Sequence, residues 1–236
     1  MDSRTFVGLL HFADGLLPVG AYAHSFGLES YTAAGKVRDA ETLEMFLRAY
    51  LRGSLAPSDA VAMLAARRVA LALGDEAVAN CLSLDCRIDA MKPAAETRNA
   101  SRQMGRQVLR IASSLGEPLA SDALVRNLFG AVERGETPGH HPVAFGAVGA
   151  ALAWDELDMA AAFLYSSCSG LVSAALRLMP LGQIAGQRVL WNLGPEIAEF
   201  AEQSLGKEID DIWSFAPGLE IAVMNHATLD ARLFRS

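Results

Sequence analysis

The chain is 236 residues long, which favours one large domain over several small ones. Its formal net charge of -7 excludes a general nucleic-acid-binding protein, because phosphate contacts require a basic surface. Three cysteines do not form an even disulfide framework, and the start of the chain lacks the layout of a signal peptide, so we expect a cytoplasmic protein.

Helical patterns cover nearly the whole chain, and no alternating strand pattern competes with them. An amphipathic start is followed by a Gly/Pro-rich loop over residues 15–20 and by a short helix over 25–34. Asp39 can cap the next helix, in which apolar residues recur at helical spacing up to Leu51. Further helices are predicted over 58–73, 76–90, 94–115, 119–132 and 142–153.

The stretch from Met159 to Leu193 is expected to organise the rest of the chain. Its first part, up to Leu176, carries no charged side chain and just reaches the length of a membrane span. Its several serines would be unfavourable in lipid, so we interpret it as the buried central helix of a soluble bundle. Pro180 removes a backbone donor and should break this helix near Met179.

Beyond the break, a helix is expected to resume through residues 182–187. Gly182 and Gly186 lack the lysine and the strand of a phosphate-binding loop, so we assign both to close helix packing. Pro195 should open the next helix, to residue 205, and residues 217–229 should form the last one. These patterns predict an all-α, single-domain helical bundle over residues 1–236, with a long buried central helix broken near Pro180.

Metal and nucleotide motifs are weak or missing in the sequence. There is no phosphate-binding loop, no dinucleotide fingerprint and no HExxH motif. Cys81 and Cys86 are five residues apart, which places them on different faces of a helix and favours small buried side chains over ligands. His140 and His141 could bind a soft divalent ion only with ligands from a partner, and otherwise mark a helix entry. We therefore expect no stably bound metal.

The early loop gathers Asp14, His24, Ser25 and Glu29 and allows two interpretations. Side chains adjacent in sequence usually diverge, so Ser25 and His24 would need distant help to act as nucleophile and base. A hydrogen-bonded loop that exposes Tyr22 for binding is favoured. The alternative is a helical enzyme with a small buried acid/base site near His24 and Glu29.

Four arginines from Arg98 to Arg110 follow one another at steps of four and lie along one side of a helix. Like charges at this spacing destabilise a helix by roughly 0.2–0.5 kcal/mol per pair, so acidic groups should offset them. Glu196, Glu199 and Glu202 form an acidic strip that could do so within the molecule. The alternative is that the arginines dock an acidic partner.

Five motifs in register resemble the UreF-type urease accessory proteins. They are LPVGAYAHSFGLE (17–29), ETRNASRQMGRQ (96–107), HPVAFG (141–146), RLMPLGQIAGQ (177–187) and the terminal RLFRS (232–236). Each motif alone is weak, but five in order across the chain are specific. The resemblance implies an all-helical protein, usually a homodimer, that is not an enzyme. Such a protein bridges a UreD/UreH-type scaffold and a UreG-type GTPase for delivery of nickel to apo-urease.

The resemblance also implies residue roles. The GTPase-facing surface would include Tyr22, His24, Ser25, Glu29 and Tyr165. The scaffold-facing tail would consist of Arg232, Leu233, Phe234, Arg235 and Ser236, and we expect residues 230–236 to be mobile until a partner binds them. A structural motif would comprise Arg177, Pro180, Gly182, Gln183, Gly186 and Gln187.

One departure from the family pattern lies just before the tail. The family commonly has His-Glu there, whereas His226 is here followed by Ala227.

The resemblance also implies that nickel is handled by the complex and not held stably by this chain. Neither nucleic acid nor a membrane is an expected partner. No residue identifies an arginine finger, so the resemblance does not decide between an adaptor and a GTPase activator.

Overall fold

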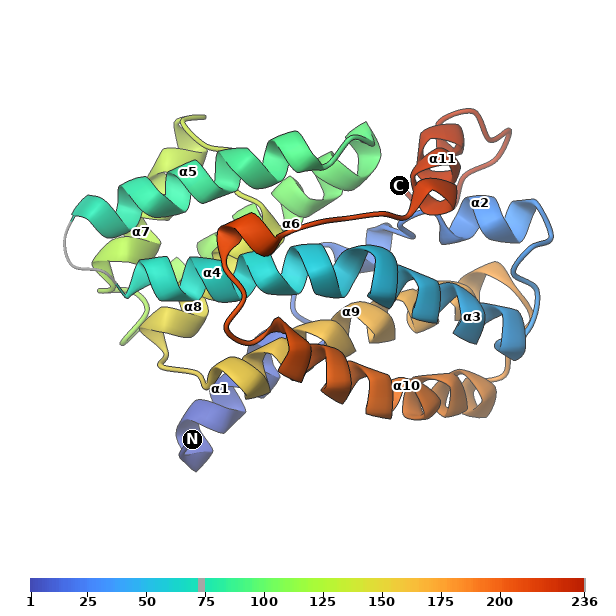
Figure 1. Ribbon diagram of the computed structural model, residues 1–236, viewed down its shortest axis with the longest axis horizontal. Helices are drawn as coiled ribbons and strands as arrows, with labels where there is room; N and C mark the ends of the chain where they lie inside the picture. Colours follow the sequence, from blue (N-terminus) through green and yellow to red (C-terminus); the bar gives the residue numbers. More distant parts are fainter. Residues whose placement is uncertain (72–74, 236) are drawn as a thin grey trace.

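The computed structural model describes residues 1–71 and 75–235. Within these residues the chain is helical and contains no strand, which confirms the all-α prediction. The helices stack on one another (Figure 1). They enclose one core of aliphatic and aromatic side chains. In chain order the α-helices are α1 (Ser3–Ala13), α2 (Leu28–Ala33), α3 (Ala40–Tyr50), α4 (Val61–Ala70), α5 (Asp75–Met91), α6 (Ala95–Ser114), α7 (Ala123–Glu133), α8 (His141–Ala151), α9 (Glu156–Leu178), α10 (Gln183–Ser204) and α11 (Pro217–His226).

A continuous helix from residue 40 to residue 70 joins α3, a π-helical stretch (η2, Leu51–Ala60) and α4. Asp39 caps it as predicted, because its carboxylate accepts from the Thr42 amide at 2.9 Å while the Thr42 hydroxyl accepts from the Asp39 amide. We predicted a new helix from residue 58, yet Pro57 lies inside the helix. The wider π turn accommodates the missing N–H and the ring of the proline.

Helix α8 is buried between α4 and α6 along nearly its whole length. Close approach here depends on glycine. A Cβ atom added at Gly146 would lie 2.3 Å from the carbonyl oxygen of Met63 on α4. A Cβ added at Gly105 of α6 would lie 2.2 Å from the carbonyl oxygen of Gly139. These contacts fix the distance between the three helices.

Helix α9 is the predicted central helix, and it ends at Leu178, one residue before the position expected from Pro180. One face of α9 is buried, whereas Tyr165 and Ser173 on the opposite face are exposed. Among the described residues, α9 is the one helix long and apolar enough to cross a membrane by length and composition. Half of its apolar window is buried inside the protein, and it packs along α10, as expected of a core helix.

Helix α10 corrects two predictions. Gly186 packs on α9, where an added Cβ would lie 3.1 Å from Val172, but Gly182 is exposed and has no neighbour within 4 Å of such an atom. Only Gly186 therefore belongs to the helix contact. Pro195 lies inside α10 and does not start a new helix. Because Pro195 is on the exposed side, water can solvate the carbonyl that it leaves without a helical donor.

The chain after α10 crosses the outside of the α3–α4 helix and then forms α11 beside α2 (Figure 1). A short 3-10 turn (η3, Ile209–Asp211) precedes this crossing. The amide of Phe215 donates to the carbonyl of Gly53 at 2.7 Å, and that of Trp213 donates to the carbonyl of Pro57 at 3.2 Å. Pro57 has no N–H to donate to Gly53 in the α-helical manner, so the π-helical stretch offers a carbonyl to the crossing segment.

Candidate functional site

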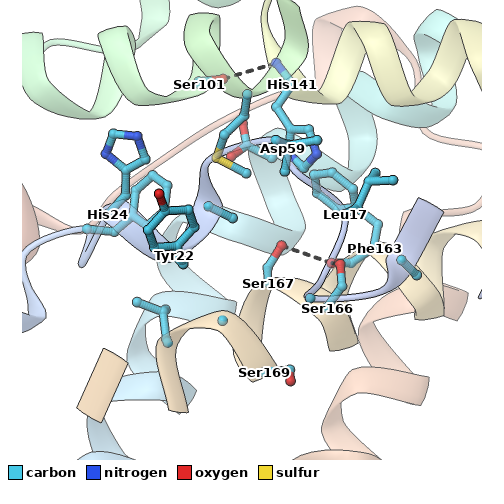
Figure 2. A pocket seen from close by; sticks show the side chains of 18 of the residues that line it. Leu17, Tyr22, His24, Asp59, Ser101, His141, Phe163, Ser166, Ser167 and Ser169 are labelled. Atoms are coloured by element: carbon cyan, nitrogen blue, oxygen red, sulfur yellow. Dashed lines mark hydrogen bonds between the residues drawn. The ribbon is translucent and has the colours of Figure 1, made fainter. Parts of the chain in front are cut away.

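The early loop between α1 and α2 covers a cavity of about 380 Å³. Figure 2 shows Tyr22 and His24 of the loop on one side of this cavity and Ser166 and Ser167 of α9 beneath it. Gly20 takes a positive φ of 85° and Gly27 one of 88°, so glycine allows both turns of the loop. The Gly/Pro-rich sequence therefore serves to close the chain over this cavity.

A buried ion pair lies in the wall of the cavity. The Lys92 ammonium is 2.7 Å from the carboxylate of Asp59, which belongs to the π-helical stretch. His141, also on the cavity wall, is buried strongly enough that desolvation lowers its pKa to about 4. The cavity is thus mostly apolar, with one compensated charge pair, a neutral imidazole and several hydroxyl groups in its wall.

The predicted GTPase-facing residues separate into exposed and buried ones. Tyr22 is 69% exposed and Tyr165 is 49% exposed. His24, Ser25 and Glu29 are buried, so in this conformation they cannot make the surface contacts that the resemblance assigned to them. Burial, followed by the charge of Arg235, lowers the pKa of His24 to about 4. These three residues therefore lie inside the protein, and Tyr22 and Tyr165 reach solvent.

The tail lies against its own chain. Phe234 is 4% exposed, and the guanidinium carbon of Arg177 lies 4.2 Å from the centre of its ring. The amide of Arg235 donates to the carbonyl of Ala23 at 2.8 Å. This placement differs from the expectation that residues 230–236 are fixed only by a partner. Ser236 lies outside the described residues.

Glu29 is the centre of a buried polar cluster that receives the tail. Its carboxylate accepts from the amide of Leu233 at 2.6 Å and from that of Phe234 at 3.0 Å. His226 lies between two carboxylates, with Nε2 2.8 Å from Glu29 and Nδ1 2.8 Å from Glu96. Burial raises the pKa of the Glu29 carboxyl, but the hydrogen bonds from His226 and from the two tail amides together bring it below its usual value.

The tail and the early loop are also joined by Arg177, at the C-terminal end of α9. Its guanidinium donates to the backbone carbonyl of Tyr22 while it covers Phe234. Of the 177–187 motif, Pro180 ends α9 and Gly186 packs on it, whereas Gln183 and Gln187 are exposed. The motif therefore combines a helix break, a close contact and a link between loop and tail.

Three of the four arginines of the α6 strip have contacts within the molecule, but not with the acidic strip that we predicted. The carboxylate of Glu196 instead pairs with Arg48 and Arg52, because α10 packs on α3 and α9. The α6 contacts are Arg98 to the Lys92 carbonyl, Arg102 to Asp89 and Arg106 to Glu133, each between 2.7 and 2.8 Å. The offsetting acidic groups thus lie on α5 and α7.

The HPVAFG motif is a helix entry. His140 precedes α8, with Nε2 2.9 Å from Asp89 and Nδ1 3.0 Å from the Ser101 hydroxyl. Both nitrogens are therefore occupied within the chain.

We expected both Cys81 and Cys86 to be buried. Cys81 is buried, but Cys86 is exposed. In the part of the chain that the structure describes, no group of three or more His, Cys, Asp or Glu side chains could hold a metal ion.

Comparison with known proteins identifies the family. The UreF family model matches residues 37–194. The urease accessory protein UreF of Paenarthrobacter aurescens (strain TC1) is 35% identical over 236 residues, which cover all of both chains. That of Corynebacterium glutamicum (strain R) is 34% identical over 237 residues, again covering both chains, and that of Trichodesmium erythraeum (strain IMS101) is 31% identical over 233 residues, covering 99% of this chain and 97% of the other. This chain belongs to the UreF family.

As a UreF-family member, the chain is a urease accessory protein and not an enzyme. The alternative of an acid/base site near His24 and Glu29 is therefore wrong. The structure gives a physical reason as well, because the Glu29 carboxylate is occupied by His226 and by the tail amides.

Sequence reasoning missed the partners of Glu29. His226 is 197 residues from Glu29 and Glu96 is 130 residues from His226, so no local pattern connects them. One sequence feature lies near this cluster, because His226 is followed by Ala227 where the family commonly has His-Glu. That feature does not indicate which residues His226 contacts. Lys92 and Asp59 were missed for the same reason, since they are 33 residues apart.

Proposed function

We propose that this UreF-family chain is the adaptor of a urease-maturation complex. It bridges a UreD/UreH-type scaffold and a UreG-type GTPase while nickel is inserted into apo-urease. The observation that supports this function is the connection between early loop and tail. Arg177 contacts both, and each presents an exposed side chain, Tyr22 on the loop and Leu233 on the tail. A bridge needs two contact regions with a fixed relative position.

The early loop is the proposed GTPase-facing region. Tyr22 and Leu16 are both exposed on it, and large exposed aromatic side chains often anchor interfaces. Tyr165 on the exposed face of α9 is the second proposed contact. Because the sequence has no phosphate-binding loop, any effect of this chain on GTP turnover requires the partner GTPase.

The C-terminal segment is the proposed scaffold-facing region. Leu233 of the tail and Ile221 and Met224 of α11 are all more than half exposed. Arg232 and Arg235 flank the apolar pair of the tail and would meet acidic groups of the scaffold. Phe234 is already buried in this chain, so the proposal assigns it to anchoring the tail and Leu233 to the partner.

A homodimer is part of the proposal. Helix α1 presents Phe6, Val7 and Leu10 to solvent, and it lies against α9. Contiguous exposed apolar side chains commonly mark an interaction surface, and a second copy of the chain is the partner that the family resemblance supports. The assembly is proposed to be cytoplasmic and to involve neither nucleic acid nor a membrane.

Nickel is proposed to pass through the complex without stable binding to this chain alone. Calorimetry of the isolated protein with Ni²⁺ and, separately, with GTP tests this part of the proposal. We expect no micromolar binding of either. Micromolar binding of nickel would assign a storage site to the chain, and micromolar binding of GTP would contradict its dependence on the GTPase.

The bridging function is tested by three-component size-exclusion chromatography. The scaffold and the GTPase are mixed with and without this chain, and the fractions are analysed for all three proteins. We expect a ternary complex only when the chain is present. Co-elution of the scaffold and the GTPase to the same extent without the chain would contradict the proposal, as would binding of the chain to only one of them.

A further inference from the structure

Helix α10 packs on α3, η2 and α9, and it has a further face that is exposed. The helix lies at the edge of the helical body (Figure 1). On this face, exposed positions follow one another at alternating steps of four and three residues: Ile184, Arg188, Trp191, Pro195, Ala198, Glu202 and, just past the end of the helix, Leu205. We call these residues the α10 seam. Such heptad spacing keeps side chains on the side of a helix where a second helix can pack against them.

The seam exposes large apolar side chains on either side of an arginine. Trp191 is 83% exposed and Ile184 is 76% exposed, with Arg188 between them along the helix. Tryptophan and arginine are among the residue types that are enriched in protein interfaces and that contribute most to their binding energy. This composition favours a protein partner over solvent.

The charges of the seam are not compensated within the described part of the chain. Neither Arg188 nor Glu202 makes an ion pair there, whereas Glu196, just outside the seam, pairs with both Arg48 and Arg52. Arg188 and Glu202 are about four helical turns apart, roughly 21 Å, so they cannot reach each other within one helix. Each charge is therefore available to a partner.

The order of the charges makes the seam complementary to itself. Consider a second copy of α10 that runs antiparallel to the first and is related to it by a twofold axis at Pro195. Arg188 of one copy then lies opposite Glu202 of the other, and the same pair forms again on the far side of the axis. A parallel arrangement would place arginine against arginine and glutamate against glutamate, which is unfavourable.

The apolar residues follow the same symmetry. In the antiparallel pair, Ile184 of one copy faces Leu205 of the other, and the large Trp191 faces the small Ala198. Alternation of large and small side chains across facing positions lets two helices interdigitate. The charges and the side-chain volumes thus favour the same arrangement, with a second copy of this chain as the partner.

From this pattern we propose that α10 pairs antiparallel with α10 of a second copy, along the seam and about a twofold axis at Pro195. The surface is separate from α1, to which the proposed homodimer is assigned, so the pairing goes beyond the proposed function. A single helix pair is a small interface compared with those of stable dimers, so the association is weak. It also weakens as the salt concentration rises, because its exposed ion pairs are screened.

Charge reversal tests the pairing, with self-association measured by sedimentation velocity at low salt. Arg188→Glu places two carboxylates opposite each other at both contacts of the pair, and Glu202→Arg does the same with two cations. Each variant alone should raise the dissociation constant of self-association roughly tenfold or more. Arg126→Glu, at an exposed arginine of α7, makes the same change in net charge and should leave self-association unchanged.

An equimolar mixture of Arg188→Glu and Glu202→Arg distinguishes lost pairing from lost folding. In a mixed pair, opposite charges face each other again at both contacts, so association should return to nearly the wild-type level. A mixture that stays dissociated would overturn the proposal, as would equal self-association of the wild type and both single variants. Weaker recruitment of the GTPase by Arg188→Glu, with self-association unchanged, would assign the seam to that partner and also overturn the proposal.

Val7→Arg separates this pairing from the proposed homodimer, because Val7 is an exposed residue of α1. The association that remains in Val7→Arg should be lost when Arg188→Glu is added. Complete loss of self-association in Val7→Arg alone would assign all pairing to α1, and it would overturn the α10 proposal while supporting the homodimer. Bridging of the scaffold and the GTPase is measured independently and decides the proposed function.

Discussion

The helical body and the C-terminal segment after α10 are held in different ways. The body, α1 to α10, is joined by apolar side chains and by helices that approach closely at glycine, as at Gly146 and Gly186. The C-terminal segment is joined through backbone amides, to the carbonyls of Gly53 and Pro57 and to the carboxylate of Glu29, and through a few buried side chains such as Val223 and Phe234. Stability should therefore depend on the body, whereas the order of the segment can change without unfolding it.

The largest expected effect on stability concerns the buried ion pair of the body. Lys92→Met leaves the Asp59 carboxylate buried without its cation, which typically costs about 3–5 kcal/mol of unfolding free energy. Urea denaturation measures this loss. The double variant Lys92→Met/Asp59→Leu should recover most of it, because an apolar pair of similar size needs no compensation. Equal stability of the wild type and Lys92→Met would mean that the pair is solvated.

A smaller loss is expected at the contact between α4 and α8. Gly146→Ala places a Cβ atom against the backbone of Met63, and overpacking of this kind typically costs about 1–3 kcal/mol. Thermal denaturation should show a lower melting temperature. Gly170→Ala in α9, where an added Cβ meets nothing within 4 Å, is the control and should be neutral or stabilising. Similar melting temperatures for the two variants would contradict the close packing of α8.

Gly53→Ala addresses the boundary between the two regions. An added Cβ would lie 2.9 Å from the carbonyl oxygen of Phe215, so the crossing segment must lift from the helix. We expect faster hydrogen exchange at the amides of Trp213 and Phe215, with a change in global stability below about 1 kcal/mol. Gly194→Ala, a helical position with open space around it, serves as the control. A global loss as large as that of Gly146→Ala would show that the segment is part of the body.

The smallest effect on stability is expected at Tyr22. Because its side chain is largely exposed, Tyr22→Ala should change the unfolding free energy by no more than about 0.5 kcal/mol. Recruitment of the GTPase, measured by pull-down and by calorimetry, should weaken roughly tenfold or more. A large loss of stability with recruitment preserved would reverse the assignment and make Tyr22 a structural residue.

The sequence was most informative where structure depends on neighbours along the chain. The cap at Asp39 and the break at Pro180 were both predicted, because each depends on residues within a few positions. Pro57 and Pro195 were misinterpreted, since a π turn in one case and an exposed helix face in the other allow a proline inside a helix. These two outcomes depend on tertiary surroundings that a local rule does not contain.

The candidate site was predictable only in part. Exposure of Tyr22 followed from its Gly/Pro-rich loop, but burial of His24, Ser25 and Glu29 did not. Burial of Glu29 requires His226 and the tail amides, which are about 200 residues away in the sequence. Pairing of the α6 arginines was expected, yet its partners depended on which helices became neighbours. Side-chain types can thus indicate that compensation is needed without indicating where it comes from.

The central claim, that the tail joins an independently stable body to the scaffold, is tested most directly by truncation. The full chain and a chain that ends at residue 229 are each mixed with the UreD/UreH-type scaffold and analysed by size-exclusion chromatography. We predict that the truncated chain keeps its helicity, its melting temperature within a few degrees and the oligomeric state of the full chain, but no longer co-elutes with the scaffold. Undiminished co-elution of the truncated chain would contradict the account.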